Sequence, residues 1–216
     1  RRMDLYVENG RIVDCGTEVS EKEEIDAAGL KVLPGLVDIH SHGAVGHDFS
    51  DADATGLKEI LRYEKSQGIT SYCPTSMTLP IDMLIRIFAS ADAVKPDADC
   101  ARIVGLNMEG PFLDPVKKGA HVEKYIRKPD IDFFRECQKA SGGRIRVVTV
   151  APNMEGAETF IRELKDDVVI SIGHTDADYD CAASAMKSGA HHVTHLYNAM
   201  NFAPQRLVPA VRAAAR

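Results

Sequence analysis

Six apolar stretches recur along the chain from residue 31 onward, and segments with the periodicity of amphipathic helices separate them. Most of the apolar stretches are nearly continuous, as expected for strands that are buried on both faces of a sheet. The helical segments carry apolar residues three or four positions apart, for example at Leu57, Ile60 and Leu61. The expected strands lie in residues 31–43, 68–77, 101–112, 144–152, 167–175 and 191–199, and the expected helices in 53–67, 81–94, 131–140, 156–165 and 178–187.

The first part of the chain has a different pattern. Asn9 and Gly10 stand between two short runs rich in strand-forming residues, and this pair is typical of a two-residue hairpin turn because both residues tolerate positive φ. A polar stretch follows at residues 18–26. We therefore expect residues 1–31 to form part of a small β-domain and residues 32–216 to form a separate alternating region.

Strands that alternate with helices predict βαβ units and a parallel sheet, which places the chain in the α/β class. Six strands would suffice for a doubly wound sheet, whereas a closed barrel needs eight strands and typically about 250 residues. The last eleven residues, RLVPAVRAAAR, show no strand pattern. We expect an incomplete (β/α)8 barrel of about six βα units, preceded by a small N-terminal β-hairpin or β-sandwich portion.

Composition narrows the functional classes. The net charge is -6 and no basic patch is obvious, so nucleic-acid binding is not expected. The sequence contains no run of 18 apolar residues, so a membrane span is not expected. No apolar signal core follows the N-terminal arginines, so secretion is not expected. The five cysteines are an odd number without a CxxC pair, which is typical of a reducing compartment. We expect a cytoplasmic protein that acts on a small molecule.

Histidine and glutamate stand at the C-terminal ends of four expected strands, the edge at which barrel enzymes build their sites. His40 and His42 are two residues apart on a strand, so their side chains point to the same face. Glu109, His174 and His195 end the third, fifth and sixth strands. Taken singly, each has an ordinary interpretation, as a loop carboxylate or as a core histidine with a satisfied hydrogen bond.

Together the five residues predict a metal site, because a parallel barrel brings the strand ends to one rim. Imidazole and carboxylate ligands suit Zn2+ best, and Fe2+ and Mn2+ are also compatible. A divalent ion with an open position lowers the pKa of water and supports hydrolysis.

Other polar residues are expected to have structural roles. His47 is expected in a loop, and His191 and His192 face opposite ways if the chain is extended there. The aspartates at 176, 178 and 180 stand where a helix begins, and we expect them to cap it.

The motifs PGLVDIHSHG, NMEGPF, VKKGAH, SIGHT and THLYNAM resemble the successive signatures of the N-acetylglucosamine-6-phosphate deacetylases of the amidohydrolase superfamily. The resemblance extends from about residue 3 to residue 206. It implies a small β-domain built from both chain ends, a (β/α)8 barrel and a homodimer. The implied reaction is metal-dependent hydrolysis of the acetamide of N-acetylglucosamine 6-phosphate, which yields acetate and glucosamine 6-phosphate.

The resemblance also implies roles for individual residues. Glu109, His174 and His195 would be the principal metal ligands. Members of the family with His-x-His at strand one can bind a second ion, here at His40 and His42, while others hold one, so the resemblance implies one or two ions. His121 would contact the sugar and the amide carbonyl. The phosphate would be bound by Asn198, the Ala199 backbone and Arg206.

Three departures from the family pattern change the expectation for activity. The family's strand-eight aspartate, which transfers protons, has no counterpart in the chain, and neither has the histidine that a neighbouring subunit contributes to the phosphate site. Leu-Val-Pro follows Arg206, where the family has an acidic residue and Pro-Gly. We therefore expect this chain alone to be weakly active or inactive.

Two alternatives remain open at this point. Cyclic amidases of the dihydroorotase type bridge two metals with a carboxylated lysine on strand four, and residues 144–152 contain no lysine. The other alternative is a non-catalytic protein that binds a metal or a sugar phosphate without turnover.

Overall fold

The computed structural model describes residues 4–13 and 24–201. The chain divides between Pro34 and Gly35 into two compact units, which are described separately. In the smaller unit, β1 (Tyr6–Glu8) and β2 (Arg11–Val13) pair antiparallel, with Tyr6 opposite Val13. Asn9 and Gly10 connect them with φ values of 50° and 71°, so the predicted hairpin is present.

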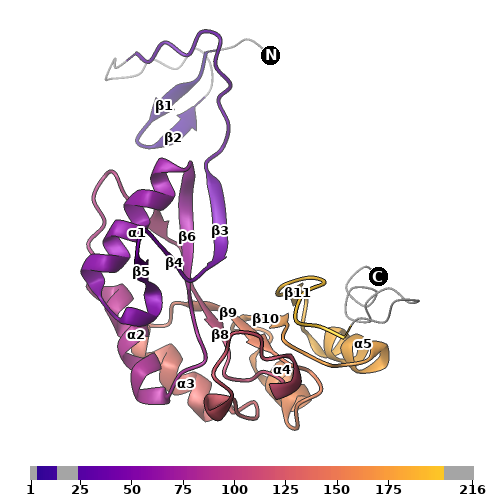
Figure 1. The fold of residues 1–216 in the computed structure, drawn as a ribbon. Helices are drawn as coiled ribbons and strands as arrows, with labels where there is room; N and C mark the ends of the chain where they lie inside the picture. Colours follow the sequence, from indigo (N-terminus) through magenta and orange to yellow (C-terminus); the bar gives the residue numbers. More distant parts are fainter. Residues whose placement is uncertain (1–3, 14–23, 202–216) are drawn as a thin grey trace. The chain divides into compact units, whose positions relative to one another are not determined.

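The larger unit is built on a parallel sheet with the strand order β11-β10-β9-β8-β6-β3, and β7 pairs with β6 (Figure 1). Neighbouring strands follow one another along the chain, as they do around a (β/α)8 barrel. The expected incomplete barrel is therefore confirmed. The strands are β3 (Leu36–Ser41), β6 (Ile69–Ser76), β7 (Arg102–Ile103), β8 (Leu106–Glu109), β9 (Ile145–Val150), β10 (Val169–Ile172) and β11 (His192–Val193).

In the described part of the chain five α-helices connect the strands, and each lies within one residue of its predicted bounds. Three of them begin at an aspartate whose side chain accepts hydrogen bonds from the first turn, namely Asp53, Asp130 and Asp178. None of the described helices combines the length and apolar character needed to cross a membrane. The helices are α1 (Ala54–Ser66), α2 (Ile81–Ala93), α3 (Ile131–Ala140), α4 (Ala157–Leu164) and α5 (Tyr179–Ser188), with 3-10 turns η1 (Phe49–Asp51), η2 (Pro115–Lys117) and η3 (Glu123–Tyr125).

One hydrophobic core joins the inner faces of the helices to the sheet. Phenylalanines form its centre where the segment after β8 meets α3 and α4. The ring of Phe112 lies 5.0 Å from that of Phe160 and 5.8 Å from that of Phe133, and Phe134 lies 5.9 Å from Phe160. These contacts fix the segment that leaves Glu109, the last residue of β8.

The first strand of the sheet differs from its prediction. We expected it to be buried on both faces, but Leu36 and Val37 are each 61% exposed. The reason is that β3 pairs only with β6 among the described strands, so it forms an edge of the sheet. An apolar pattern reports strand character but not the number of neighbours that a strand has.

Two further details differ from prediction. The third expected strand is interrupted, because β7 ends at Ile103 and β8 begins at Leu106. His47 does not lie in a loop but in β5 (His47–Asp48), which pairs antiparallel with β4 (Gly43–Ala44). This short hairpin follows directly on the His40–His42 motif.

The phenylalanine cluster gives a test of the core. Phe160 is 1% exposed, so Phe160→Ala should lower the free energy of unfolding by about 3–5 kcal/mol, through lost burial and the cavity that remains. Urea denaturation measures the change. Val116→Ala is the control, since Val116 is 74% exposed, and it should change stability by less than about 0.5 kcal/mol. Equal effects of the two substitutions would contradict the described core.

Candidate metal centre

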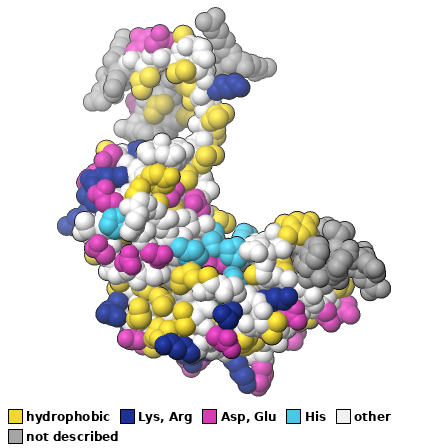
Figure 2. All heavy atoms as spheres, viewed as in Figure 1, with side chains coloured by type: hydrophobic (Ala, Val, Ile, Leu, Met, Phe, Trp, Pro, Cys, Tyr) yellow, Lys and Arg dark blue, Asp and Glu magenta, His cyan; other side chains and the backbone are white. Residues whose placement is uncertain are grey.

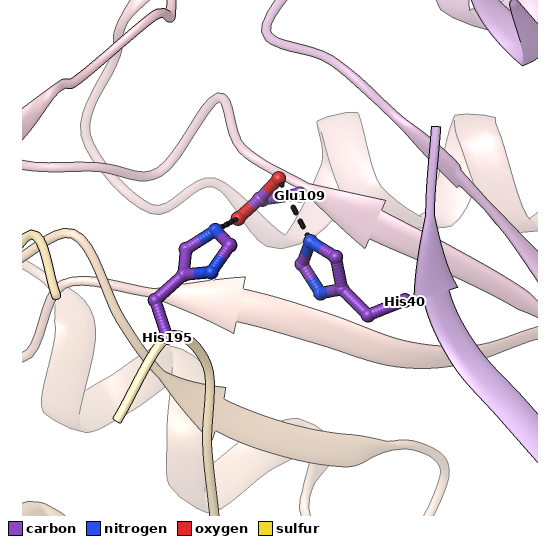
Figure 3. Close-up of side chains that lie close together, drawn as sticks. All are labelled: His40, Glu109 and His195. Atoms are coloured by element: carbon purple, nitrogen blue, oxygen red, sulfur yellow. Dashed lines mark ion pairs between the residues drawn. The ribbon is translucent and has the colours of Figure 1, made fainter. Parts of the chain in front are cut away.

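Five imidazoles surround the carboxylate of Glu109, whose side chain is 1% exposed. They come from distant parts of the sequence, and Figure 2 shows histidine side chains gathered on one face of the larger unit. The Nε2 atoms lie from Glu109 Oε2 at 3.2 Å (His40), 3.0 Å (His42) and 3.6 Å (His121), and from Oε1 at 3.1 Å (His174) and 2.7 Å (His195). Figure 3 shows His40 and His195 each pointing at a different oxygen of the carboxylate.

The sheet topology explains this convergence. Glu109 is the last residue of β8, His40 lies near the end of β3, and His174 and His195 each follow a strand by two residues. The carboxyl ends of parallel strands meet at one edge. The structure therefore brings together all five residues for which the sequence predicts metal binding, and it adds His121 to the same cluster.

Local backbone geometry at the cluster is unusual. His174 and His195 have φ values of 48° and 52°, in the left-handed region that costs non-glycine residues about 1–3 kcal/mol. Such conformations persist where the surrounding structure imposes them. Gly110 has φ of 78°, and a Cβ there would lie 2.0 Å from Thr78 Oγ1. This contact explains why glycine must follow Glu109 in the NMEGPF motif.

The electrostatics keep Glu109 ionised. Burial alone raises the pKa of the carboxyl group, but the polar contacts with His121, His174, His40 and His42 lower it more, so the net pKa lies well below the usual range. A buried negative charge of this kind needs positive or hydrogen-bonding partners.

The histidines respond differently to their surroundings. Burial lowers the pKa of His42, but the contact with Glu109 raises it more, and the net shift is upward. For His195, burial lowers the pKa, and neighbouring His40 and His174 add to the effect against the opposing charge of Glu109. The lowered pKa favours the neutral ring at His195, which is the form that binds metals.

Backbone carbonyls fix the tautomer of two rings. His42 Nδ1 lies 3.0 Å from the carbonyl oxygen of Thr75, and His174 Nδ1 lies 2.9 Å from that of Lys117. A carbonyl oxygen only accepts, so each Nδ1 must carry the proton. In the neutral rings the Nε2 lone pairs are then directed to the cluster and are free to bind a cation.

His121 is oriented in the opposite sense. The backbone N–H of Thr78 donates to His121 Nδ1 over 3.2 Å, so this nitrogen carries no proton. The neutral ring then has its proton on Nε2, which makes it a hydrogen-bond donor at the site. His121 lies close enough to Glu109 and His174 to be counted in a group of potential ligands, as His40 and His195 do with Glu109. Its tautomer assigns it instead to donation.

The donor set fits a divalent cation. Glu109 Oε2 and His40 Nε2 are both buried and lie 3.2 Å apart, yet neither atom makes a well-oriented hydrogen bond to any described residue. Buried polar atoms without partners are costly, and a cation between them would satisfy both. Imidazole and carboxylate ligands suit zinc and its neighbours among the divalent metals. These residues can therefore hold a metal ion.

Comparison with known proteins points to one enzyme. No protein-family model matches the chain. Over 204 residues the chain is 36% identical to N-acetylglucosamine-6-phosphate deacetylase of Bacillus subtilis, and over 210 residues it is 34% identical to that of Homo sapiens. The chain is homologous to the N-acetylglucosamine-6-phosphate deacetylases. These matches cover 90% and 92% of the chain but 52% and 51% of the relatives, so the chain spans about half the length of the curated relatives it matches.

Solved deacetylase structures agree with this relationship. The crystal structure of the enzyme from Mycobacterium smegmatis superimposes with a TM-score of 0.83 at 31% identity, over 96% of this chain and 55% of that one. A second structure of the same enzyme, an aspartate-to-alanine mutant in complex with N-acetyl-D-glucosamine-6-phosphate, gives a TM-score of 0.74 at 33% identity over 82% of this chain and 46% of that one. The homology thus extends to the fold that positions the cluster.

A cavity of about 440 Å³ opens beside the cluster in this deacetylase homologue. His121, Asn198 and Ala199, for which the resemblance implies substrate binding, all line it. Met77 and Val116 add apolar surface, and Lys117 adds a cation. Arg206 lies outside the described residues.

Several other polar residues have structural contacts. His191 is exposed, and its Nδ1 lies 3.1 Å from the Gly189 carbonyl, while His192 hydrogen-bonds Ser171 over 2.9 Å. Asp178 caps α5 as predicted. Asp176 does not cap the helix, because its carboxylate pairs with Lys117 at 3.2 Å.

The sequence did not predict the polar network behind His174, which is formed by Asp114, Asn153 and Thr175. Asp114 directly precedes Pro115, a pair that often begins a turn, but this signal does not indicate which distant residues the turn contacts. The network is therefore visible only in the fold.

The tautomers predict unequal roles for two histidines in metal binding. His174→Ala removes a ring whose lone pair faces Glu109, and it should weaken Zn2+ binding by more than the roughly 10–100-fold that loss of a ligand's hydrogen-bond partner causes. His121→Ala removes a donor and should weaken binding less than about 10-fold. Competition with a chromogenic chelator measures both affinities. A loss at His121 as large as that at His174 would contradict the tautomer assignment.

Proposed function

We propose that this chain carries the metal-binding part of an enzyme that hydrolyses the acetamide of N-acetylglucosamine 6-phosphate. The products are acetate and glucosamine 6-phosphate. The observation that carries the proposal is the buried, ionised Glu109 within a cluster of imidazoles beside one cavity. The homology supports the choice of substrate, because relatives whose matches cover about 90% of this chain carry this enzyme's name.

We assign the metal to Glu109, His174 and His195. The proposed ion is Zn2+, and Fe2+ and Mn2+ are alternatives with the same ligand preferences. His40 and His42 would hold a second ion, since their Nε2 atoms lie at the other oxygen of Glu109. A bound divalent cation supplies Lewis acidity, which polarises an amide carbonyl and favours attack by water.

The chain's own residues bind and orient the substrate in this proposal. His121 presents an Nε2 proton at the cluster, and it would donate this proton in a hydrogen bond to the amide oxygen. A donor at that atom stabilises the negative charge that develops when the carbonyl is attacked. Asn198 and the Ala199 N–H would bind the phosphate, together with Arg206, whose guanidinium suits bidentate contacts.

Proton transfer is the part of the reaction that the described residues lack. Glu109 is the only carboxylate among the described residues that line the cavity, and its low pKa makes it a poor proton acceptor. Removal of a general acid or base commonly lowers rates by about 10²–10⁴-fold. We therefore propose that this chain alone is weakly active or inactive.

The lack of a second carboxylate among the described cavity residues also favours a second candidate function. In it the chain binds a metal or a sugar phosphate without turnover. We propose that the protein is located in the cytoplasm, because the described cysteines form no disulfide and Cys73, Cys100 and Cys137 are buried. We also propose that the whole enzyme is a homodimer that acts on an amino-sugar phosphate.

Acetate release distinguishes these functions. With Zn2+ supplied, the purified chain should release acetate from N-acetylglucosamine 6-phosphate at a rate about 10²–10⁴-fold below that of the full-length Bacillus subtilis relative under the same conditions. An enzyme-coupled acetate assay measures both rates. A rate equal to that of the full-length relative would contradict the proposed impairment, and no detectable turnover together with substrate binding would favour the non-catalytic function.

Metal binding should also stabilise the fold. A ligand at 100 times its dissociation constant contributes about 2.7 kcal/mol, so Zn2+ should raise the midpoint of thermal unfolding by roughly 5–10 °C for a chain of this size. A chelator should reverse the shift. Differential scanning calorimetry measures it, with Glu109→Gln as the matched variant, since it keeps the shape of the side chain but removes its charge. An unchanged midpoint in the unmodified chain would refute the metal site.

A further inference from the structure

We propose that Asp114 is a positioning residue, which holds the ring of His174 in the orientation that binds metal. It acts through the 3-10 turn η2 and the carbonyl of Lys117. The inference rests on the proposed metal site. It concerns a residue that does not line the cavity and would not touch the ion.

His174 needs such support because its own backbone does not favour its position. It follows β10 with a φ of 48°, a left-handed conformation that the surroundings must impose. Its Nε2 lies 3.1 Å from Glu109 Oε1. A small rotation of the ring would carry Nε2 away from the carboxylate, so the contact at Nδ1 sets the position of the ligand atom.

The segment from Asp114 to Lys117 holds His174 at two points. The backbone N–H of Asp114 donates to the carbonyl of His174 over 3.0 Å. At the other end of the segment, the carbonyl of Lys117 accepts from His174 Nδ1 over 2.9 Å. The same four residues therefore fix both the backbone and the ring of His174.

The side chain of Asp114 sets the shape of this segment. Asp114 is 6% exposed, and a buried carboxylate requires donors around it. One oxygen accepts from the N–H of Val116 over 2.8 Å, which starts η2, and the other accepts from Asn153 Nδ2 and from the N–H of Asp176 over 3.3 Å. The turn then closes with Lys117 N–H donating to the Asp114 carbonyl over 3.0 Å.

Asn153 links Asp114 to the residue that follows His174. Its amide nitrogen donates to Asp114, while its amide oxygen accepts from the hydroxyl of Thr175 over 2.6 Å. Thr175 is the residue after His174, so the loops that follow β8, β9 and β10 are joined behind one ligand. Lys117 adds an ion pair with Asp176 at 3.2 Å on the same loop.

A residue that only caps a turn needs fewer hydrogen bonds than Asp114 makes. Asp53 caps α1 by accepting from the N–H groups of Thr55 and Gly56, all within one turn of its own chain. Asp114 caps η2 in the same way through Val116 but also binds two other loops, and its turn ends on the ring of His174. This difference makes Asp53 a suitable control.

The test is the affinity of the purified chain for Zn2+, measured by competition with a chelator. Asp114→Ala should weaken binding by about 10–100-fold, the effect typical of losing the partner that orients a ligand. Asp53→Ala removes a cap of similar kind and should leave the affinity unchanged. Circular dichroism of each variant establishes that it is folded.

A double-mutant cycle separates positioning from general loosening of the structure. If Asp114 acts through His174, Asp114→Ala should have no further effect on Zn2+ affinity in a His174→Ala background, because the ring to be oriented is gone. An equal loss in both backgrounds would show that Asp114 supports the fold in general and would overturn the proposal.

An exchange of partners keeps the proposal testable where binding by His174→Ala is too weak to measure. Asp114→Asn alone places an amide group against Asn153 and should weaken binding. The pair Asp114→Asn with Asn153→Asp restores the donor and the acceptor between these two side chains and should recover part of the affinity, because the N–H of Asp176 still loses its acceptor. Failure of the pair to recover any affinity would count against the proposal.

The outcomes for the two proposals differ. If the unmodified chain binds no Zn2+, the proposed function fails before Asp114 is tested. If the unmodified chain binds Zn2+ and Asp114→Ala binds it equally well, the metal site stands and the role of Asp114 is refuted.

Discussion

The larger unit depends on one buried charge. Glu109 ends β8 as an ionised carboxylate with a 1% exposed side chain, and such a charge is stable only among close polar partners. The partners are imidazoles from β3, from the segments after β8, β10 and β11, and from the turn after β3. Since they are distant in sequence, the register of the parallel strands must be correct before the charge is stabilised. The cluster and the sheet therefore support each other.

One carboxylate cannot use five imidazoles in the same way, and the surrounding backbone divides them. Carbonyl groups of Thr75 and Lys117 hold protons on the outer nitrogens of His42 and His174, whereas the N–H of Thr78 takes the outer nitrogen of His121 as its acceptor. In their neutral forms, which are the forms that bind a metal, similar side chains thus present a lone pair in two cases and a proton in the third. The chemical difference lies in β6 and in the loops after β6 and β8, not in the residue type.

Much of this arrangement could be predicted from the sequence. Periodicity located the helices to within one residue, for example 53–67 for α1 (Ala54–Ser66), because an amphipathic pattern and its cap are local properties. The spacing of His40 and His42 predicted a common face, since side chains alternate along a strand. The exposure of Val37 could not be predicted, because an apolar run does not state whether a second strand lies beside it. The roles of His40 and His42 as metal ligands stay predictions.

The contacts behind the cluster could not be predicted from the sequence, for a related reason. Asp114 and Asn153 are ordinary turn residues in the sequence, and only the fold places their side chains against each other. Residue type identifies groups that can bind a metal, but the choice between ligand and donor depends on which backbone atom lies on the far side of each ring. The carbonyls of Thr75 and Lys117 and the N–H of Thr78, which make that choice, all belong to the larger unit. Orientation of these rings is thus a property of this segment itself, separate from whatever group transfers the proton.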